Sequence, residues 1–525
     1  MPHPSHIPPW STFHRACLLT AALASATVVT ACDDDDSDDD AQESATASLA
    51  MPTAIGASLL VVDMEADEAL ILDVEAAVAT GGAGVSPIER VRLPGEPLAT
   101  YTRNGSSAAL VLAAGLRGVG QGAVLVQVRE DATHTSHALG GAFTAVEQSA
   151  DGRFAIAYHR QGGSEVVFSP GELAVVDLDT DDPSARSVAL ALPGGAPLSV
   201  HMSPPMRVDG ETVHIAAIPS DNHVTLLDLG HLDGPEIVVQ LGTPTGEGRV
   251  TPEQVVFDAA GGRVLVRAID SDDLFVLTLE PADAGRDNRI WPAVEVLPAG
   301  SSPADIATFR SGDDTRVLAV SEDGPDVRVV TLPGGDDTAV PMDVDANRVL
   351  GFTDAEDRPQ ALLYRVSSAW AALADLDELE LDPADHTRVL KLEQPVQDIT
   401  PLPSQALAIV DHAPALLGVL DLIGGGEQLI AVHGAGTAQD GGDTRVMIAE
   451  DDLASLWVGS VGQHLVGFVS LGNGRTGEVL LARPIASMAA VPQAGRVGVV
   501  HDDGSITLLD ADTPGRQSAV RVETQ

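Results

Sequence analysis

A short apolar phrase returns ten times along this chain, and it constrains the fold more than any other feature. Each copy has four to six apolar or alternating residues, an Asp or Thr near its end in most cases, and a turn after it. The copies begin at Glu68, Gly122, Glu172, His223, Asp273, Asp326, Gln360, Leu416, Leu465 and Ser505. A period of about fifty residues indicates a repeat architecture, in which neighbouring units bury each other's apolar faces.

Two further strands are expected before most copies of the phrase, and one after it. The upstream segment has the pattern strand, polar turn, strand, as in FTAVEQSADGRFAIAYH from Phe143 and EQVVFDAAGGRVLVRAI from Glu253. Asp-Gly and Gly-Gly at these turns accept the positive φ of a tight hairpin. The downstream strand is represented by EIVVQL from Glu236. Each unit is therefore expected to be a meander of four antiparallel strands.

A four-stranded meander cannot bury both of its faces alone, whereas radial stacking of such units buries them and leaves only short, protected edges. The sequence therefore predicts an all-β fold, a single β-propeller of seven to ten blades over residues 53–525. The period and the hairpins resemble the broad YVTN and WD-type propeller class, although the Trp-Asp pair of WD repeats is absent. A β-sandwich array is the alternative.

Three details of the propeller are open. Ten phrases would mean ten blades, yet propellers typically have fewer, so some phrases are candidates for second strands, most of all at the short step between Thr331 and Arg365. The segment SSAWAALADLDELELDPAD from Ser367 is predicted to be a helical insertion, because Ala and Leu recur near helical spacing before Pro383. The first unit lacks an obvious inner strand, so pairing of the terminal strands is predicted to close the ring.

The first 31 residues are predicted to be a cleaved signal peptide. Ala16 to Ala31 is an uncharged run of 16 residues, shorter than the about 20 that a transmembrane helix needs. The run ends in Val29-Thr30-Ala31-Cys32, which resembles the bacterial lipobox, in which a branched apolar residue and two small residues precede a lipidated cysteine. The resemblance implies a lipid anchor on Cys32 and a place in the cell envelope, on the outer membrane or the periplasmic face of the inner membrane. An ordinary secretory signal is the alternative.

Residues 32–52 are predicted to be the lipidated cysteine and a disordered acidic tether. Asp33 to Asp40 holds seven carboxylates in eight residues, which repel one another and cannot bury apolar area. Cys17 would leave with the signal peptide, so no disulfide is expected. The formal charge of −48 at pH 7 disfavours nucleic-acid binding. The expected partners are the membrane, through the lipid, and an envelope protein, and the chain is expected to be a monomer.

Two segments offer side chains of the kinds that bind metal ions. The first contains Glu130, Asp131, His134 and His137. Its imidazoles lie three residues apart and would share a zinc ion if the segment turned helically, whereas exposed loop histidines are the alternative. The second contains Asp177, Asp179 and Asp181. These carboxylates alternate as in calcium loops, without the Gly and the distal Glu of such loops. No cofactor is expected otherwise, and calcium or another divalent cation is the open alternative.

No motif of nucleophilic catalysis stands out, since Gly459-Ser-Val-Gly462 lacks the G-x-S-x-G spacing. Strand ends in different units carry polar residues that would permit metal binding or acid–base catalysis if they converged at the central channel. These residues are His159, Arg160, His201, Asp411, His412 and His501. A structural role within each blade is the alternative.

The leading functional prediction is a non-catalytic binding or scaffold lipoprotein. The propeller lipoprotein of the outer-membrane β-barrel assembly machinery is an analogy for this role at the level of architecture. The alternative is an enzyme that resembles the lactonase or quinoprotein propellers, with its site at the mouth of the central channel. A quinone cofactor is disfavoured, because blades that carry it normally supply docking tryptophans.

Overall fold

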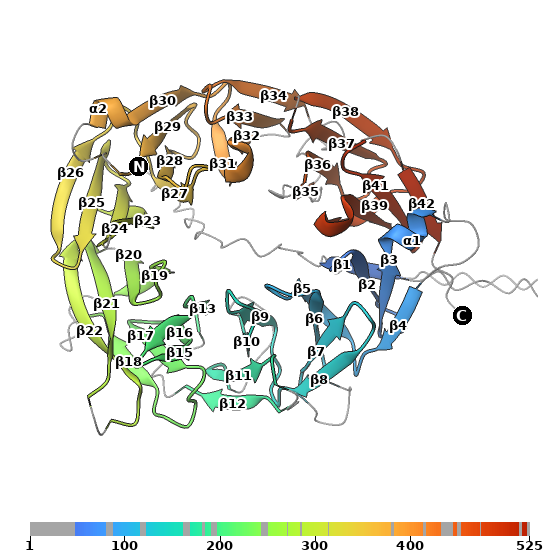
Figure 1. The fold of residues 1–525 in the computed structure, drawn as a ribbon, viewed down its shortest axis with the longest axis horizontal. Coiled ribbons are helices and arrows are strands. Elements are labelled where there is room, and N and C mark those ends of the chain that lie inside the picture. Colours follow the sequence, from blue (N-terminus) through green and yellow to red (C-terminus); the bar gives the residue numbers. More distant parts are fainter. Residues whose placement is uncertain are drawn as a thin grey trace, which may run out of the picture.

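The computed structural model shows a ring of four-stranded antiparallel sheets (Figure 1). Ten sheets follow one another in chain order, so the predicted all-β propeller is confirmed and has ten blades. The structure describes residues 48–79, 88–115, 122–160, 169–180, 184–190, 197–242, 250–269, 271–283, 286–312, 314–377, 379, 383–412, 416–431, 445–448, 453–472, 474–513 and 517–521.

Blades are numbered here along the chain, and the strands of each blade are given from the innermost to the outermost. Blades 1 to 5 contain β1 (Leu49–Ile55), β2 (Ser58–Asp63), β3 (Glu68–Asp73) and β4 (Ile88–Arg92); β5 (Pro97–Thr102), β6 (Ala108–Ala113), β7 (Val124–Arg129) and β8 (His134–Ala138); β9 (Ala145–Gln148), β10 (Phe154–Tyr158), β11 (Glu172–Asp177) and β12 (Arg186–Ala189); β13 (His201–Met202), β16 (Ile215–Ser220), β17 (His223–Asp228) and β18 (Ile237–Gln240); and β19 (Thr251–Phe257), β20 (Arg263–Ile269), β21 (Asp273–Pro281) and β22 (Ile290–Pro298).

Blades 6 to 10 continue the same order. They contain β23 (Pro303–Ser311), β24 (Asp314–Ser321), β25 (Asp326–Leu332) and β26 (Asp336–Pro341); β27 (Arg348–Thr353), β28 (Pro359–Tyr364), β29 (Trp370–Asp375) and β30 (Thr387–Lys391); β31 (Val396–Leu402), β32 (Leu407–His412), β33 (Leu416–Asp421) and β34 (Glu427–Ala431); β35 (Arg445–Ile448), β36 (Ser455–Ser460), β37 (Leu465–Ser470) and β38 (Arg475–Leu480); and β39 (Ile485–Val491), β40 (Arg496–His501), β41 (Ser505–Asp510) and β42 (Gln517–Arg521).

The remaining described elements are short. A hairpin of β14 (Met206–Val208) and β15 (Glu211–Val213) lies between the first two strands of blade 4. The helical turns are α1 (Val74–Ala79), α2 (Pro383–His386), η1 (Pro403–Gln405) and η2 (Pro492–Ala494).

The repeated phrase is the third strand of its blade in every copy but one. The exception is the copy at Gln360, which forms β28, the second strand of blade 7. The copy at Gln360 is thus a second strand, as the short spacing between Thr331 and Arg365 suggested. The number of blades is nevertheless ten. The third strand of blade 7 is β29, which begins at Trp370 inside the segment predicted to be helical.

The helical prediction for that segment was wrong, because β29 is covered on both sides. Ala372 and Ala374 pack toward blade 6, and Ala371 and Leu373 pack toward blade 8. A strand buried on both faces has a continuous run of apolar residues, which periodicity alone does not distinguish from a helix. Among the described residues of the segment, only those of α2 at its end are helical.

The predicted closure by shared terminal strands was also wrong. Blade 1 has its own inner strand, β1, and blade 10 is complete, so neither blade lacks a strand for the other to supply. Side-chain packing closes the ring instead, through a cluster that includes Leu59 and Leu70 from blade 1 and Val500 and Leu508 from blade 10. At Gly498, an added Cβ would lie 2.6 Å from Leu59 Cδ2, so this contact needs a glycine.

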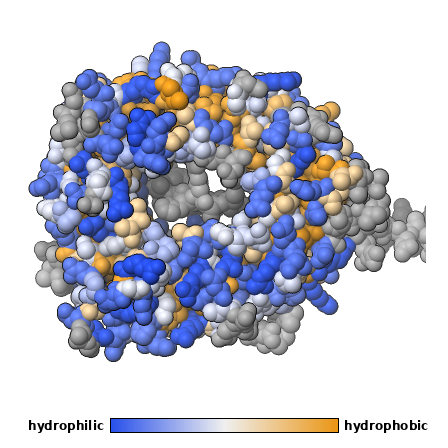
Figure 2. All heavy atoms as spheres, in the orientation of Figure 1, coloured by the Kyte–Doolittle hydropathy of each residue, from blue (hydrophilic) through white to orange (hydrophobic). Residues whose placement is uncertain are grey.

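Each pair of neighbouring blades shares one apolar cluster, and the described residues form ten such clusters. The core is therefore a series of apolar layers between blades. Each Å² of apolar surface buried in a layer stabilises the fold by about 25 cal/mol. On the face in Figure 2, hydrophilic side chains predominate and hydrophobic ones gather in patches around the ring.

The predicted signal peptide, Cys32 and most of the predicted tether lie outside the described residues. Strand β1 begins at Leu49, inside the range 32–52 that the sequence assigned to the tether. Across the part of the chain that the structure describes, no helix combines the length and the apolar character needed to cross a membrane.

Candidate functional site

The first predicted metal segment does not bring its ligands together. Residues from His134 form a strand, β8, in which side chains three positions apart lie on opposite faces. Accordingly, His134 is exposed and His137 is fully buried. The Glu130 carboxylate accepts hydrogen bonds from the backbone N–H of Ala57 at 3.0 Å and from Ser58 Oγ at 3.3 Å, so it fastens blade 2 to blade 1.

The second predicted metal segment is held by arginines. Asp177, at the end of β11, pairs with Arg153 at 3.2 Å, and Asp179 pairs with Arg103 of blade 2. Asp181 lies outside the described residues. Throughout the described ranges, no group of three or more His, Cys, Asp or Glu side chains is arranged to hold a metal ion.

Three of the candidate histidines occupy the same position in three blades. His159, His412 and His501 lie at or directly after the end of the second strand, in blades 3, 8 and 10. Nδ1–H of His412 donates to the carbonyl oxygen of Pro395 at 3.0 Å, and that of His501 donates to Pro484 at 2.9 Å. Each proline directly precedes the first strand of its blade, so these imidazoles join the first strand to the second.

In His412 and in His501, the other ring nitrogen is engaged within the same blade. His412 Nε2 lies 2.6 Å from Glu427 Oε1, and both side chains are almost fully buried. His501 Nε2 lies 2.7 Å from Thr507 Oγ1 and accepts the hydroxyl proton, because its Nδ1 is already the donor. Both imidazoles therefore serve the interior of a blade.

The other strand-end candidates have separate surroundings. His201 Nε2 lies 2.8 Å from Ser199 Oγ on blade 4. Asp411 and His412 are adjacent on β32, so their side chains lie on opposite faces of the strand. Arg160 acts electrostatically on the carboxylate of Glu147.

Glu147 and its neighbours Tyr101, Tyr158 and Arg160 form a partly buried titratable cluster, here called the Glu147 cluster. Glu147 lies on β9, the inner strand of blade 3, where burial raises its pKa to about 7 and Arg160 partly offsets the shift. Burial and the Glu147 charge raise the pKa of Tyr158 to about 12. Tyr101 Oη, from blade 2, accepts the N–H of Val146 at 3.3 Å. A carboxyl group that titrates near neutrality is suited to proton transfer.

Sequence reasoning missed a buried network that joins blades 5, 6 and 7. Gln254 Nε2 donates to Asp305 Oδ1 at 2.7 Å, and Asp305 Oδ2 accepts the N–H of Val349 at 3.0 Å. Arg267 donates to Gln254 Oε1 at 3.2 Å and to Glu253 Oε2 at 2.6 Å. Burial raises the pKa of Asp305, while the bonds from Val349 and Gln254 act against that rise. These side chains hold neighbouring inner strands at a fixed spacing.

A sequence signal for this network exists in the first strands. In each of these strands a proline stands two residues before the polar residue: Pro252 before Gln254, and Pro303 before Asp305. A β-bulge lies between the proline and the polar residue in both strands. Proline has no N–H for the strand ladder, so it favours such irregular strand starts. The bulge turns the polar side chain toward the next blade.

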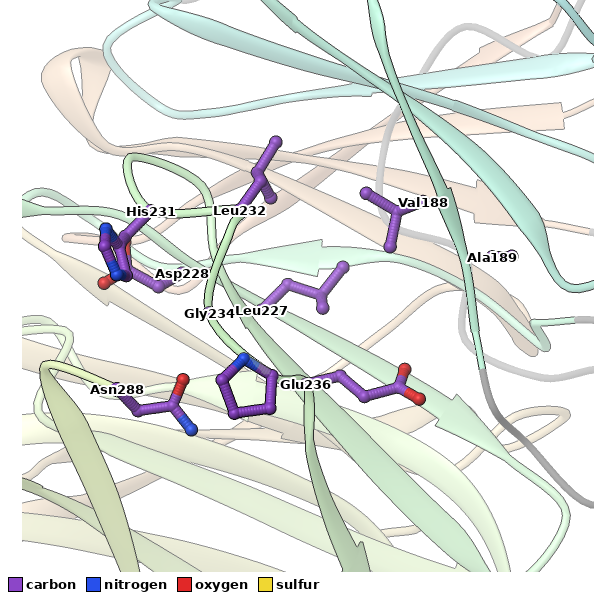
Figure 3. A pocket seen from close by; sticks show the side chains of 10 residues that line it. Val188, Ala189, Leu227, Asp228, His231, Leu232, Gly234, Glu236 and Asn288 are labelled. Carbon is purple, nitrogen blue, oxygen red and sulfur yellow. The ribbon is translucent and has the colours of Figure 1, made fainter. Parts of the chain in front are cut away.

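A cavity of about 330 Å³ lies on the outer side of the ring, between blades 3, 4 and 5 (Figure 3). Its lining residues are Val188, Ala189, Leu227, Asp228, His231, Leu232, Gly234, Pro235, Glu236 and Asn288. In the close-up, Leu227 and Leu232 lie in the middle, with His231 at the left and Glu236 at the lower right. Asp228 is engaged by Arg289, whose Nε donates to Oδ2 at 2.6 Å. The cavity is therefore lined by both apolar and polar side chains.

Comparison with known proteins yields structural similarity alone. No protein-family model and no curated protein matches the chain. Among solved structures, the dihydro-heme d1 dehydrogenase NirN in complex with DHE is 12% identical, with 80% of this chain and 72% of that chain covered and a TM-score of 0.39. Apo AztD from Citrobacter koseri is 14% identical, with 69% and 93% covered and a TM-score of 0.34. Hydrazine synthase from Kuenenia stuttgartiensis is 12% identical, with 74% and 97% covered and a TM-score of 0.30. Similarity at this level says nothing about what the chain binds or catalyses.

Proposed function

We propose that this chain is a non-catalytic binding scaffold of the bacterial cell envelope, attached to the membrane by a lipid on Cys32. The observation that carries the proposal is the use of the polar side chains near the inner strands. His412 and His501 bond within their own blades, and Gln254 and Asp305 join neighbouring blades. Groups that would serve chemistry at a channel mouth are thus used to build a rigid ring.

A binding role is supported by the outer strands. Large apolar side chains on them are exposed: Val238, Trp291, Val294, Val296, Val389 and Leu480. Three of them lie on β22 alone, and exposed apolar groups on an outer strand indicate contact with another molecule. The closed ring completes its core within one chain, which favours a monomer that binds an envelope protein through its rim.

The anchor is tested by metabolic labelling with radioactive palmitate. Wild type is expected to be labelled, and Cys32→Ala is expected to lose the label and leave the membrane fraction. Cys17→Ala is the matched control and should be labelled like wild type, because Cys17 lies in the predicted signal peptide. Equal labelling of Cys32→Ala and wild type would contradict the anchor.

The binding role is tested by photo-crosslinking in intact cells. A photoreactive residue at Val296, which is 51% exposed on β22, is expected to give a discrete adduct with an envelope protein. The same residue at the exposed Asp357 is the control and should give none. Absence of any adduct from Val296 and from equivalent positions on the other outer strands would contradict the binding role.

The Glu147 cluster favours a second candidate, a hydrolase-like enzyme with Glu147 as its general base. With a pKa of about 7, this carboxyl group is half ionised at neutral pH, as a general base requires. Hydrolysis assays with lactones and aryl esters, with and without calcium or zinc, distinguish the two functions. The scaffold predicts no turnover above buffer. Turnover that Glu147→Gln abolishes and the exposed-site control Glu65→Gln retains would establish the enzyme instead.

A further inference from the structure

A second cavity, of about 380 Å³, lies between blades 6 and 7. Blade 6 contributes Asp343, Val344 and Asp345, from the segment between β26 and β27. Blade 7 contributes Ser368 and Trp370 at the start of β29, and Val389 of β30. The volume is within the range of small-molecule sites, which begins at about 300 Å³.

Both carboxylates at this cavity are uncommitted. Asp343 and Asp345 are exposed, and neither forms a hydrogen bond or ion pair through its side chain with any residue in the described ranges. Asp228, at the other cavity, is by contrast paired with Arg289. Two unpaired negative charges at the edge of one hollow create a potential that attracts a cation.

The indole of Trp370 supplies a second, aromatic feature of the same cavity. Its side chain is 47% exposed, and no cation is recorded over its ring in the part of the chain that is described. Trp291 is a comparison within the same protein, because it is 43% exposed and carries the guanidinium of Arg286 at 3.9 Å from its ring centroid. The exposed indole of Trp291 thus shows the kind of contact that an organic cation would make with Trp370.

The nearest lysine does not line the cavity. Lys391, the chain's only lysine, is the strand partner of Trp370 across β29 and β30 and is exposed. The cavity is therefore lined by an aromatic face, two carboxylates, a hydroxyl group and two valines, without a cation of its own.

We propose that the cavity between blades 6 and 7 binds a small organic cation of the quaternary ammonium class. The methylated ammonium group stacks on the indole of Trp370 and lies against Val344 and Val389, and the carboxylates of Asp343 and Asp345 neutralise its charge. Quaternary ammonium groups suit such a site because they combine positive charge with apolar methyl groups and are weakly hydrated. The proposal goes beyond the scaffold role and does not depend on it.

Equilibrium dialysis with radiolabelled choline on the full chain tests the proposal. Saturable binding is expected, and 3,3-dimethylbutanol, the uncharged isostere, is expected to compete at least about tenfold more weakly, since the isostere lacks the charge that the indole and carboxylates recognise. Sodium chloride at matched ionic strength is the salt control. Absence of saturable choline binding, or equal competition by the isostere, overturns the proposal.

Variants assign the binding to this cavity. Trp370→Leu is expected to lower choline affinity about tenfold, and Asp343→Asn and Asp345→Asn severalfold each. Trp291→Leu and Asp357→Asn remove an indole and a carboxylate elsewhere and should leave the affinity unchanged. Thermal unfolding of every variant establishes that the ring is intact. Unchanged affinity in Trp370→Leu also overturns the proposal.

Discussion

Replacing Glu147 by glutamine should stabilise the protein, and the gain should grow with pH. Glu147 lies on β9 among Tyr158, Tyr101 and Arg160, and burial is the largest cause of its raised pKa. The folded protein therefore keeps a proton on this carboxyl group up to about pH 7, whereas the ordinary pKa of 4.5 applies in the unfolded chain. Glutamine resembles the protonated form at every pH.

The size of the effect follows from the two pKa values. Their separation, from 4.5 to about 7, corresponds to about 3 kcal/mol, because each pKa unit is worth about 1.4 kcal/mol. Between these values the folded state binds more protons than the unfolded state, so stability falls as the pH rises. The contribution of Glu147 is present in full below about pH 4.5 and is lost progressively as the pH rises through about 7.

Urea denaturation followed by circular dichroism, at intervals from pH 5 to pH 8, measures this difference. Glu147→Gln and wild type should differ little at pH 5 and by about 3 kcal/mol at pH 8. Glu65→Gln is the control, since it removes one negative charge from an exposed position of the same acidic chain. If the two variants gained equally at every pH, Glu147 would not be desolvated in the fold and the reasoning would fail.

Two further substitutions test the packing of the ring. Gly498→Ala should lower the free energy of unfolding, measured by urea titration, by about 1–3 kcal/mol, because its methyl group would collide with the buried Leu59. Adding Leu59→Val to this variant should restore part of the lost stability. If it restores none, the strain does not lie at this contact. His412→Leu should cost about 3–5 kcal/mol, because the buried Glu427 carboxylate would lose its imidazole partner and keep the hydrogen bond from the Glu393 backbone N–H. A loss below about 1 kcal/mol would show that the pair contributes little.

For the candidate site, the sequence predicted which residues lie at strand ends and did not predict their hydrogen-bond partners. The sequence correctly placed His412 and His501 at the ends of strands in different units, because the repeat defines where strands stop. Their hydrogen bonds to Pro395 and Pro484 depend on which carbonyl faces each imidazole. That geometry arises from the pairing of strands within a blade and leaves no mark in residue spacing.

The same limit explains the histidine pair of the first metal segment. A separation of three residues puts His134 and His137 on one face of a helix, and on opposite faces of a strand. Local propensity in the segment does not choose between these, whereas pairing of β8 with β7 does. Distance along the chain therefore predicted a shared ligand position that the sheet does not provide.

The repeat by itself determined that the chain forms four-stranded meanders stacked around an axis, because alternating apolar strands with tight turns have few other ways to bury both faces. Tertiary structure alone decided the number of blades, the strand identity of β29 and the closure of the ring. Each of these depends on what covers a strand from the neighbouring blade, as Gly498 of blade 10 receives Leu59 of blade 1. Such coverage joins residues of different blades, which are not neighbours in the chain, so no local pattern records it.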